Sequence, residues 1–82
     1  MTYRIQIDKP AMKFLKKQPQ AQRERILQAI RRLPDSGDIQ PMSGQKDLYR
    51  LRVGTFRVLY TIIGDLLIVR VLDIGNRGDA YK

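Results

Sequence analysis

Residues 48–60 alternate between apolar and polar side chains on both sides of Gly54-Thr55. Glycine supplies the positive φ that a tight turn requires, so the alternation predicts a β-hairpin that turns at these two residues. Because side chains alternate across a sheet, this register places an apolar set and a basic set on opposite faces. The apolar set is Tyr49, Leu51, Val53, Phe56, Val58 and Tyr60. The basic set is Arg50, Arg52 and Arg57, with Arg52 directly opposite Arg57.

The N-terminal part of the chain predicts a strand followed by two helices. Residues 3–7 alternate with period two, which indicates a strand. Asp8 is a good N-cap and Pro10 suits a first helical turn, so we expect a helix over residues 9–17. A second helix begins at Pro19, and the short link predicts an antiparallel helical hairpin. Its apolar stripe has helical spacing and consists of Ile26, Leu27, Ile30 and Leu33.

The C-terminal half predicts a three-stranded meander after a loop over residues 35–47. Gly64-Asp65 indicates a second two-residue turn, which would pair Tyr60 with Val69. The predicted fold class is α+β, in the order β-α-α-β-β-β, with the helical hairpin packed on one face of a small antiparallel sheet. The other face would combine the arginines with an apolar content typical of an interface. Its apolar members are Leu59, Ile63, Leu66, Ile68, Leu72 and Ile74.

The composition excludes several kinds of site. A chain of 82 residues fits one small domain, residues 1–82. Cysteine and histidine are both absent, so we expect no disulfide, no metal and no histidine general base. Neither a P-loop nor a G-x-G-x-x-G motif is present, so we expect no small-molecule cofactor. No apolar run approaches the roughly 18 residues of a membrane span. The chain starts with strand-like alternation instead of a signal peptide, so we expect a cytoplasmic protein without a membrane partner.

The charge of the chain indicates an acidic partner. Sixteen Lys and Arg residues against eight Asp and Glu residues give a net charge of +8. Nine of the basic residues and only two of the acidic ones lie in residues 1–34, mostly within the predicted helices. These helices present either a solvated charged face or a non-specific footprint for a nucleic-acid backbone. The overall charge fits nucleic acid or an acidic protein equally well.

The three arginines of the hairpin indicate a phosphate site. Like charges directly opposite each other destabilise a ladder, so a sheet built only for stability would not place Arg52 against Arg57. A planar guanidinium binds phosphate bidentately. The alternative is a solvated face on which arginine stems cover apolar surface. RNA supplies its own nucleophile, the 2′-OH, so an enzyme need only align it, accept its proton and neutralise the phosphate. Arginines meet the last requirement, and the proton acceptor stays open.

The segments YRLRVG (49–54), FRVLY (56–60) and GNRGDAY (75–81) resemble the RelE/ParE superfamily of bacterial and archaeal toxins. The order of elements matches over essentially all of the chain. RelE-like members are ribosome-dependent endoribonucleases that cut mRNA through 2′-OH attack, leaving a cyclic phosphate and a 5′-OH. The resemblance implies a metal-independent active site. Its catalytic residues would be the basic pair Arg50 and Arg52, the phosphate-contacting Arg57, and Arg77 and Tyr81 near the C-terminus.

Two positions depart from the pattern of the superfamily. Some members have lysine in place of Arg50 and Arg52, and many have histidine in place of Asn76. Both departures concern the groups that would move protons. The resemblance also implies three partners, namely a cognate acidic antitoxin, the ribosome and mRNA. The alternatives are a ParE-like inhibitor of DNA gyrase and a non-catalytic RNA- or protein-binding module of the same fold.

Overall fold

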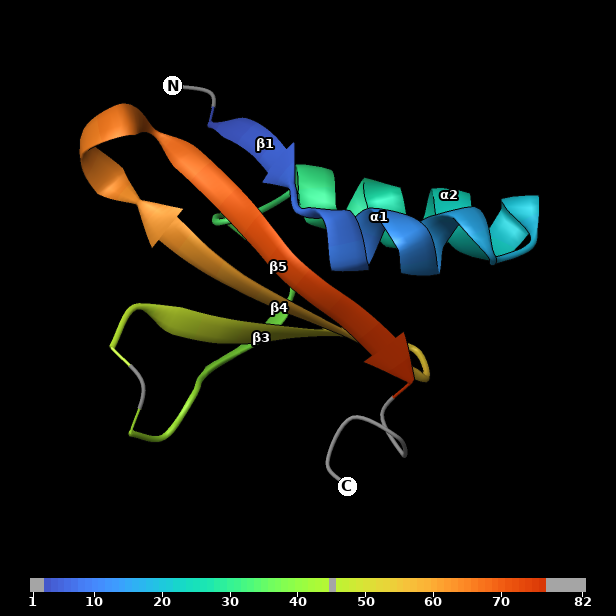
Figure 1. Cartoon of the computed structure of the whole chain (residues 1–82). Coiled ribbons are helices and arrows are strands. Elements are labelled where there is room, and N and C mark those ends of the chain that lie inside the picture. Colours follow the sequence, from blue (N-terminus) through green and yellow to red (C-terminus); the bar gives the residue numbers. More distant parts are fainter. Residues whose placement is uncertain (1–2, 45, 77–82) are drawn as a thin grey trace.

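A computed structural model of the chain describes residues 3–44 and 46–76. Both helices lie on the same side of one sheet (Figure 1), which confirms the α+β class. The sheet has five strands in the order β1-β5-β4-β3-β2. Within the described residues, no helix has the length and apolar character needed to cross a membrane. The elements are β1 (Arg4–Ile7), α1 (Lys9–Lys16), α2 (Gln20–Arg31), β2 (Asp38–Pro41), β3 (Leu48–Val53), β4 (Phe56–Ile63), the 3₁₀ turn η1 (Gly64–Leu66) and β5 (Ile68–Asn76).

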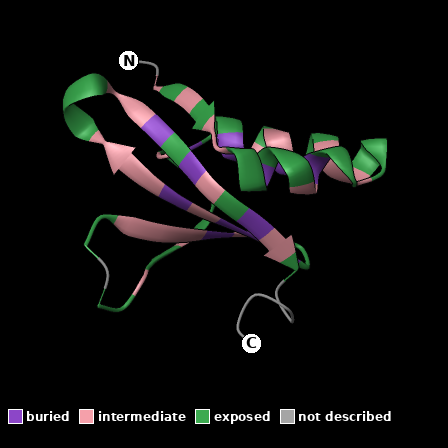
Figure 2. Cartoon of the chain, viewed as in Figure 1, coloured by how far each residue is buried: buried purple, intermediate pink, exposed green. Residues whose placement is uncertain are grey.

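One core joins the helices to the sheet. α1 packs against β5 and α2 packs against β3. Phe14 of α1 meets Phe56 of β4 edge to face, with ring centroids 5.9 Å apart. Buried positions recur along β5 (Figure 2), as expected for a strand with one covered face. The buried apolar residues are Ala11, Leu15, Ile26, Ile30, Leu33, Leu51, Val53, Phe56, Val58, Tyr60, Val69, Val71 and Ile74.

The hairpin at Gly54-Thr55 has the predicted register. Gly54 has a φ of 60°, which is the left-handed conformation that glycine tolerates best. Val53 pairs with Phe56, and Arg52 pairs with Arg57. Further along, Tyr49 pairs with Tyr60, and their rings stack with centroids 5.5 Å apart. Tyr60 is buried in the core, and this burial, followed by the neighbouring Tyr49, raises the pKa of Tyr60 to about 12.

Asp8 precedes α1 as predicted, but its side chain does not cap the helix. Its carboxylate instead binds Arg70 of β5, with Arg70 Nε 3.1 Å from each carboxylate oxygen and Nη2 2.9 Å from Oδ2. A carboxylate held by a guanidinium fork is stabilised in its charged form. The hydrogen bond from Arg70 accordingly lowers the pKa of Asp8, and the pKa of Arg70 rises in turn. The pair joins the start of α1 to the sheet.

The sheet contains one strand that was not predicted and one parallel pairing. The predicted loop over residues 35–47 includes β2, which pairs antiparallel with β3 along the edge of the sheet. Gly37 precedes this strand, and a Cβ atom there would come within 2.7 Å of the Leu51 side chain. β1 runs parallel to β5, so the sheet is mixed and only mostly antiparallel. A parallel pair needs a long crossover, and here the crossover contains both helices.

The predicted register of the second hairpin is wrong. Gly64 and Asp65 do not form a two-residue turn but begin η1, and Leu67 follows η1 as its C-cap with a φ of 53°. The longer turn pairs Tyr60 with Val71 instead of Val69. A bulge opposite Leu59 and Tyr60 then shifts the register by one further residue. A one-residue shift moves side chains to the opposite face of a strand. Ile74, which was expected opposite the helices, therefore pairs with Val58 and is buried in the core.

Candidate functional site

The side of the sheet that carries Arg50, Arg52 and Arg57, which we name the arginine face, is organised in two rows across four strands. Directly paired residues of adjacent strands share a face, so each row can be followed through the register. The first row is Asp38 of β2, Arg52 of β3, Arg57 of β4 and Gly75 of β5. The second row is Gln40 of β2, Arg50 of β3, Leu59 of β4 and Asp73 of β5.

β2 supplies polar partners to the two arginines of β3. Asp38 lies opposite Arg52, with its Oδ2 atom 3.5 Å from Arg52 Nε. Gln40 lies opposite Arg50 and accepts a hydrogen bond from Arg50 Nη2 through its amide oxygen. Both arginines stay half-exposed. The edge strand therefore orients the basic pair but leaves part of each guanidinium open to solvent.

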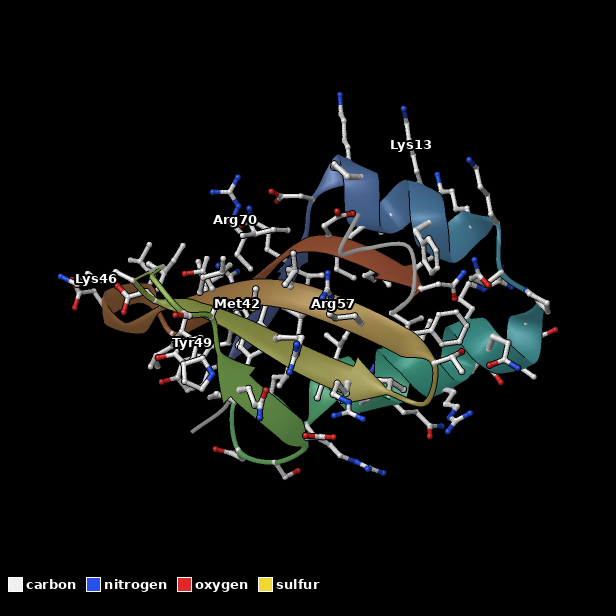
Figure 3. The ribbon with its side chains drawn as sticks, turned by 90° about the horizontal axis from the view of Figure 1, so that it is seen from below. Lys13, Met42, Lys46, Tyr49, Arg57 and Arg70 are labelled. Carbon is white, nitrogen blue, oxygen red and sulfur yellow. The ribbon has the colours of Figure 1, made fainter. Side chains whose placement is uncertain are left out.

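Arg57 occupies a different environment, because only 4% of its surface is exposed. Figure 3 shows it over the middle of the sheet, whereas Lys13 extends from α1 into solvent. Burial disfavours a charged group and lowers the pKa of Arg57. The charge of Arg50 lowers this pKa further, and the charge of Asp73 raises it. Little of Arg57 is open to solvent.

Asp73 reaches the arginine face because of the bulge in the β4–β5 pairing. The bulge sets Asp73 opposite Leu59, and Leu59 lies two residues from Arg57 on the same face of β4. One carboxylate oxygen, Oδ1, accepts a hydrogen bond of 2.9 Å from the backbone N–H of Ile74. Asp73 is exposed. A carboxylate thus lies diagonally across the ladder from the buried arginine.

The structure places three of the five predicted site residues. It brings Arg50, Arg52 and Arg57 together on one face, whereas Arg77 and Tyr81 lie outside the described residues. Asp38, Gln40 and Asp73 were not among the predicted residues. The signal for β2 was the short alternation Asp38-Ile39-Gln40 before Pro41, since proline is accepted in an edge strand. The signal for the bulge was the adjacent apolar pair Val71-Leu72, which interrupts the alternation of β5.

The guanidiniums on this face suit an anion such as a phosphodiester. Three guanidiniums can neutralise phosphate oxygens as charge develops on them. Acceptor groups lie at both ends of the rows, Asp38 and Gln40 at one and Asp73 at the other. Within residues 3–44 and 46–76, no three acidic side chains gather closely enough to hold a metal ion.

The chain matches a known toxin family over almost its whole length. Residues 5–81 match the profile described as "ParE toxin of type II toxin-antitoxin system, parDE". Two archaeal crystal structures are also similar to it. The matched chain of the archaeal RelE–RelB complex from Pyrococcus horikoshii is 31% identical, with a TM-score of 0.77, over 98% of this chain and 100% of that one.

The second archaeal structure is the RelB–RelE antitoxin–toxin complex from Methanococcus jannaschii, in which the matched chain is 27% identical. Its TM-score is 0.76, and the match covers 93% of this chain and 94% of that one. The isolated Escherichia coli RelE toxin has the same fold at 23% identity, with a TM-score of 0.77 over 92% of this chain and 84% of that one. The chain therefore belongs to the RelE/ParE family and is a toxin of a type II toxin–antitoxin system.

Proposed function

We propose that the chain is a ribosome-dependent endoribonuclease that inhibits translation by cleaving mRNA. The observation that carries this proposal is the convergence of Arg50, Arg52 and Arg57 on one face of the sheet. Arg52 and Arg57 are directly paired although their like charges repel, an arrangement that an anionic ligand would stabilise. A phosphodiester of mRNA is an anion that these arginines can bind, and its cleavage would stop translation and growth.

In this proposal the arginines have different roles according to their exposure. The half-exposed Arg50 and Arg52 hold the backbone of the mRNA. The buried Arg57 lies in a less polar environment, where its charge acts more strongly on the scissile phosphate. By the resemblance to RelE-like toxins, Arg77 supplies a further phosphate contact and Tyr81 stacks on a base. Both residues complete the proposed catalytic set of Arg50, Arg52, Arg57, Arg77 and Tyr81.

The ribosome is required in this proposal because the arginine face by itself cannot align the substrate. In-line attack needs the 2′-oxygen about 3–3.5 Å from phosphorus and opposite the leaving oxygen. A single-stranded RNA on an exposed sheet face has many other conformations. The decoding site of the ribosome holds a codon in one conformation and would supply this alignment.

A cognate acidic antitoxin is the proposed inhibitor. The matched archaeal structures are complexes with RelB antitoxins, and the net charge of +8 favours an acidic partner here. We expect an antitoxin segment to place apolar side chains around Leu59, Ile68 and Leu72, which are half-buried. Its acidic groups would then approach the arginines and exclude RNA from them.

Inhibition of DNA gyrase is the second candidate function, because the matched profile carries the name of ParE toxins. A gyrase inhibitor does not need a phosphate site on this face, so the arginine cluster favours RNA cleavage. A non-catalytic RNA- or protein-binding module of the same fold is the third candidate.

The test combines purified protein with mRNA in three settings. Programmed ribosomes with an empty A site should support cleavage of their mRNA, free mRNA at physiological salt should stay largely intact, and supercoiling by gyrase should continue unchanged. Loss of supercoiling without mRNA cleavage would favour the second candidate. Equally fast cleavage of free mRNA would show that the ribosome is not required.

A further inference from the structure

We propose that Asp73 is the general base that accepts the proton of the attacking 2′-OH, an inference that rests on the function proposed above. The chain contains no histidine, and arginine keeps its proton at any physiological pH. The groups that bind phosphate on the arginine face therefore cannot also deprotonate the nucleophile. A carboxylate is the strongest remaining acceptor that is charged at neutral pH.

The position of Asp73 follows from the strand register. Asp73 pairs with Leu59, and Gly75 pairs with Arg57, so Asp73 and Arg57 are diagonal neighbours on one face. Diagonal neighbours lie about 7–8 Å apart at the Cα atoms, within reach of a long side chain. The negative charge of Asp73 acts on Arg57. It opposes the lowering of the Arg57 pKa that burial and Arg50 cause. Gly75 adds no side chain to the row, so none from that position stands beside Arg57.

The two oxygens of Asp73 have separate tasks. Oδ1 accepts the hydrogen bond from the Ile74 N–H and fixes the orientation of the carboxylate. Within the described residues, no hydrogen bond to Oδ2 is present, which leaves that oxygen available to a substrate hydroxyl. Among the described residues, the charged side chains that share this end of the arginine face are Arg57 of β4 and Arg50 of β3. Both are positive and attract the carboxylate.

Other described carboxylates on the same face are less suitable. Asp38 lies at the far end of the first row and faces Arg52 Nε at 3.5 Å. Asp8 is held by three contacts to Arg70. Of these three carboxylates, only Asp73 lies next to Arg57. One phosphodiester could therefore bind Arg57 through its phosphate and give its 2′-OH proton to Asp73.

The reaction is balanced with this base. The 2′-OH proton passes to Asp73, the 2′-oxygen forms a bond to phosphorus, and the bond from phosphorus to the 5′-oxygen breaks. The leaving 5′-oxygen takes the electron pair of that bond and a proton from water. Asp73 then returns its proton to the resulting hydroxide. The products are a 2′,3′-cyclic phosphate and a 5′-OH.

The test is Asp73→Asn, measured by single-turnover cleavage of mRNA on programmed ribosomes. Asparagine keeps an oxygen acceptor for the Ile74 N–H, so the thermal unfolding temperature and the affinity for ribosomes should stay close to those of the wild type. The cleavage rate should fall by about 10²–10⁴-fold, the range that general base catalysis contributes. Asp65→Asn, an exposed aspartate in the turn at the other end of the same hairpin, is the matched control and should cleave normally.

The pH dependence separates a base from a residue that only positions Arg57. The wild-type rate should be nearly level between pH 6 and 9, because carboxylates stay charged in this range. The Asp73→Asn rate should rise about tenfold per pH unit, since hydroxide must replace the missing base. Asp73→Glu keeps a carboxylate and should recover part of the lost rate. If the asparagine variant does not fold, the rate of the glutamate variant still tests the proposal.

The outcomes are distinguishable. If the wild type cleaves and Asp73→Asn cleaves within about threefold of it, the assignment of Asp73 is wrong and the proposed function stands. A slow Asp73→Asn variant whose rate stays level with pH would also contradict the assignment. If the wild type itself does not cleave mRNA on ribosomes, the proposed function is wrong and the role of Asp73 falls with it.

Discussion

Arg52 of β3 and Arg57 of β4 are directly paired across the hairpin that turns at Gly54-Thr55, with both guanidiniums on the same face of the sheet. Like charges in this position destabilise a ladder. Asp38 of the edge strand, whose Oδ2 atom lies 3.5 Å from Arg52 Nε, offsets part of that repulsion. Arg57 lies one strand further in and is buried. Such a costly arrangement is most easily explained by a function that needs the two charges together.

Replacing Arg57 should abolish the toxic activity without unfolding the domain. In the proposed mechanism, Arg57→Ala removes a donor to the scissile phosphate, and losses of about 10²–10³-fold in rate are typical for such donors. Arg31→Ala on the exposed side of α2 is the matched control, because it changes the net charge equally. Growth arrest in cells and thermal unfolding of the purified variants are the two measurements. A folded Arg57→Ala protein that still arrests growth would contradict the assigned role.

The Asp8–Arg70 ion pair should stabilise the fold at neutral pH but not in acid. The pKa of Asp8 is lower in the folded chain than in the unfolded chain, so its contribution is complete above about pH 4 and is lost as the pH falls further. Asp8→Asn should therefore lower the unfolding temperature at pH 7 and have little effect at pH 2. The exposed Asp35→Asn, measured by the same thermal scans, is the control. An equal effect of Asp8→Asn at both pH values would show that the ion pair is not the cause.

Tyr60 should make the fold sensitive to alkaline pH. Its pKa is raised to about 12 in the folded chain, against about 10 in an unfolded one. The stabilisation from the neutral buried phenol is therefore complete below about pH 10 and is lost as the pH rises towards 12. Relative to Tyr60→Phe, the wild type should lose on the order of 2 kcal/mol of unfolding free energy between pH 8 and 11.5, because one pKa unit corresponds to about 1.4 kcal/mol.

Denaturant unfolding of both proteins at the two pH values measures this difference. Lysine deprotonation affects the wild type and Tyr60→Phe alike, so the comparison isolates the phenol. A difference that stays constant with pH would mean that Tyr60 can ionise in place, without the burial that the structure gives it.

Sequence patterns identified the elements that are set by local chemistry. The register around Gly54 was predictable because one residue type favours the required positive φ. The turn at Gly64 was not, since it ends with Leu67 in a left-handed conformation that leucine seldom adopts. The bulge depends on how two strands fit together, and it decides that Asp73 lies on the arginine face and Ile74 in the core. The three arginines were therefore found from sequence, whereas the carboxylate beside them was not.

The complex with the antitoxin should depend on salt in its rate of formation more than in its persistence. Opposite charges speed association at low ionic strength, and at about 1 M salt they are screened beyond about 3 Å. Apolar contacts around Leu59, Ile68 and Leu72 should still hold the complex at that salt concentration. Ile68→Ala should weaken it there, whereas Met12→Ala on exposed α1 surface should not. Complete dissociation of the wild-type complex at about 1 M salt would mean that the apolar anchor does not exist.

In the proposed function, the arginine face promotes attack by the 2′-OH of mRNA in the ribosome. The most direct measurement compares two mRNAs in programmed ribosomes, one entirely ribonucleotide and one with a 2′-deoxy nucleotide at the cleaved position. We expect the first mRNA to be cut to a 2′,3′-cyclic phosphate and a 5′-OH, and the second to stay intact although the protein still binds the ribosome. Cleavage of the deoxy-substituted mRNA at a comparable rate, or cleavage of neither, would contradict it.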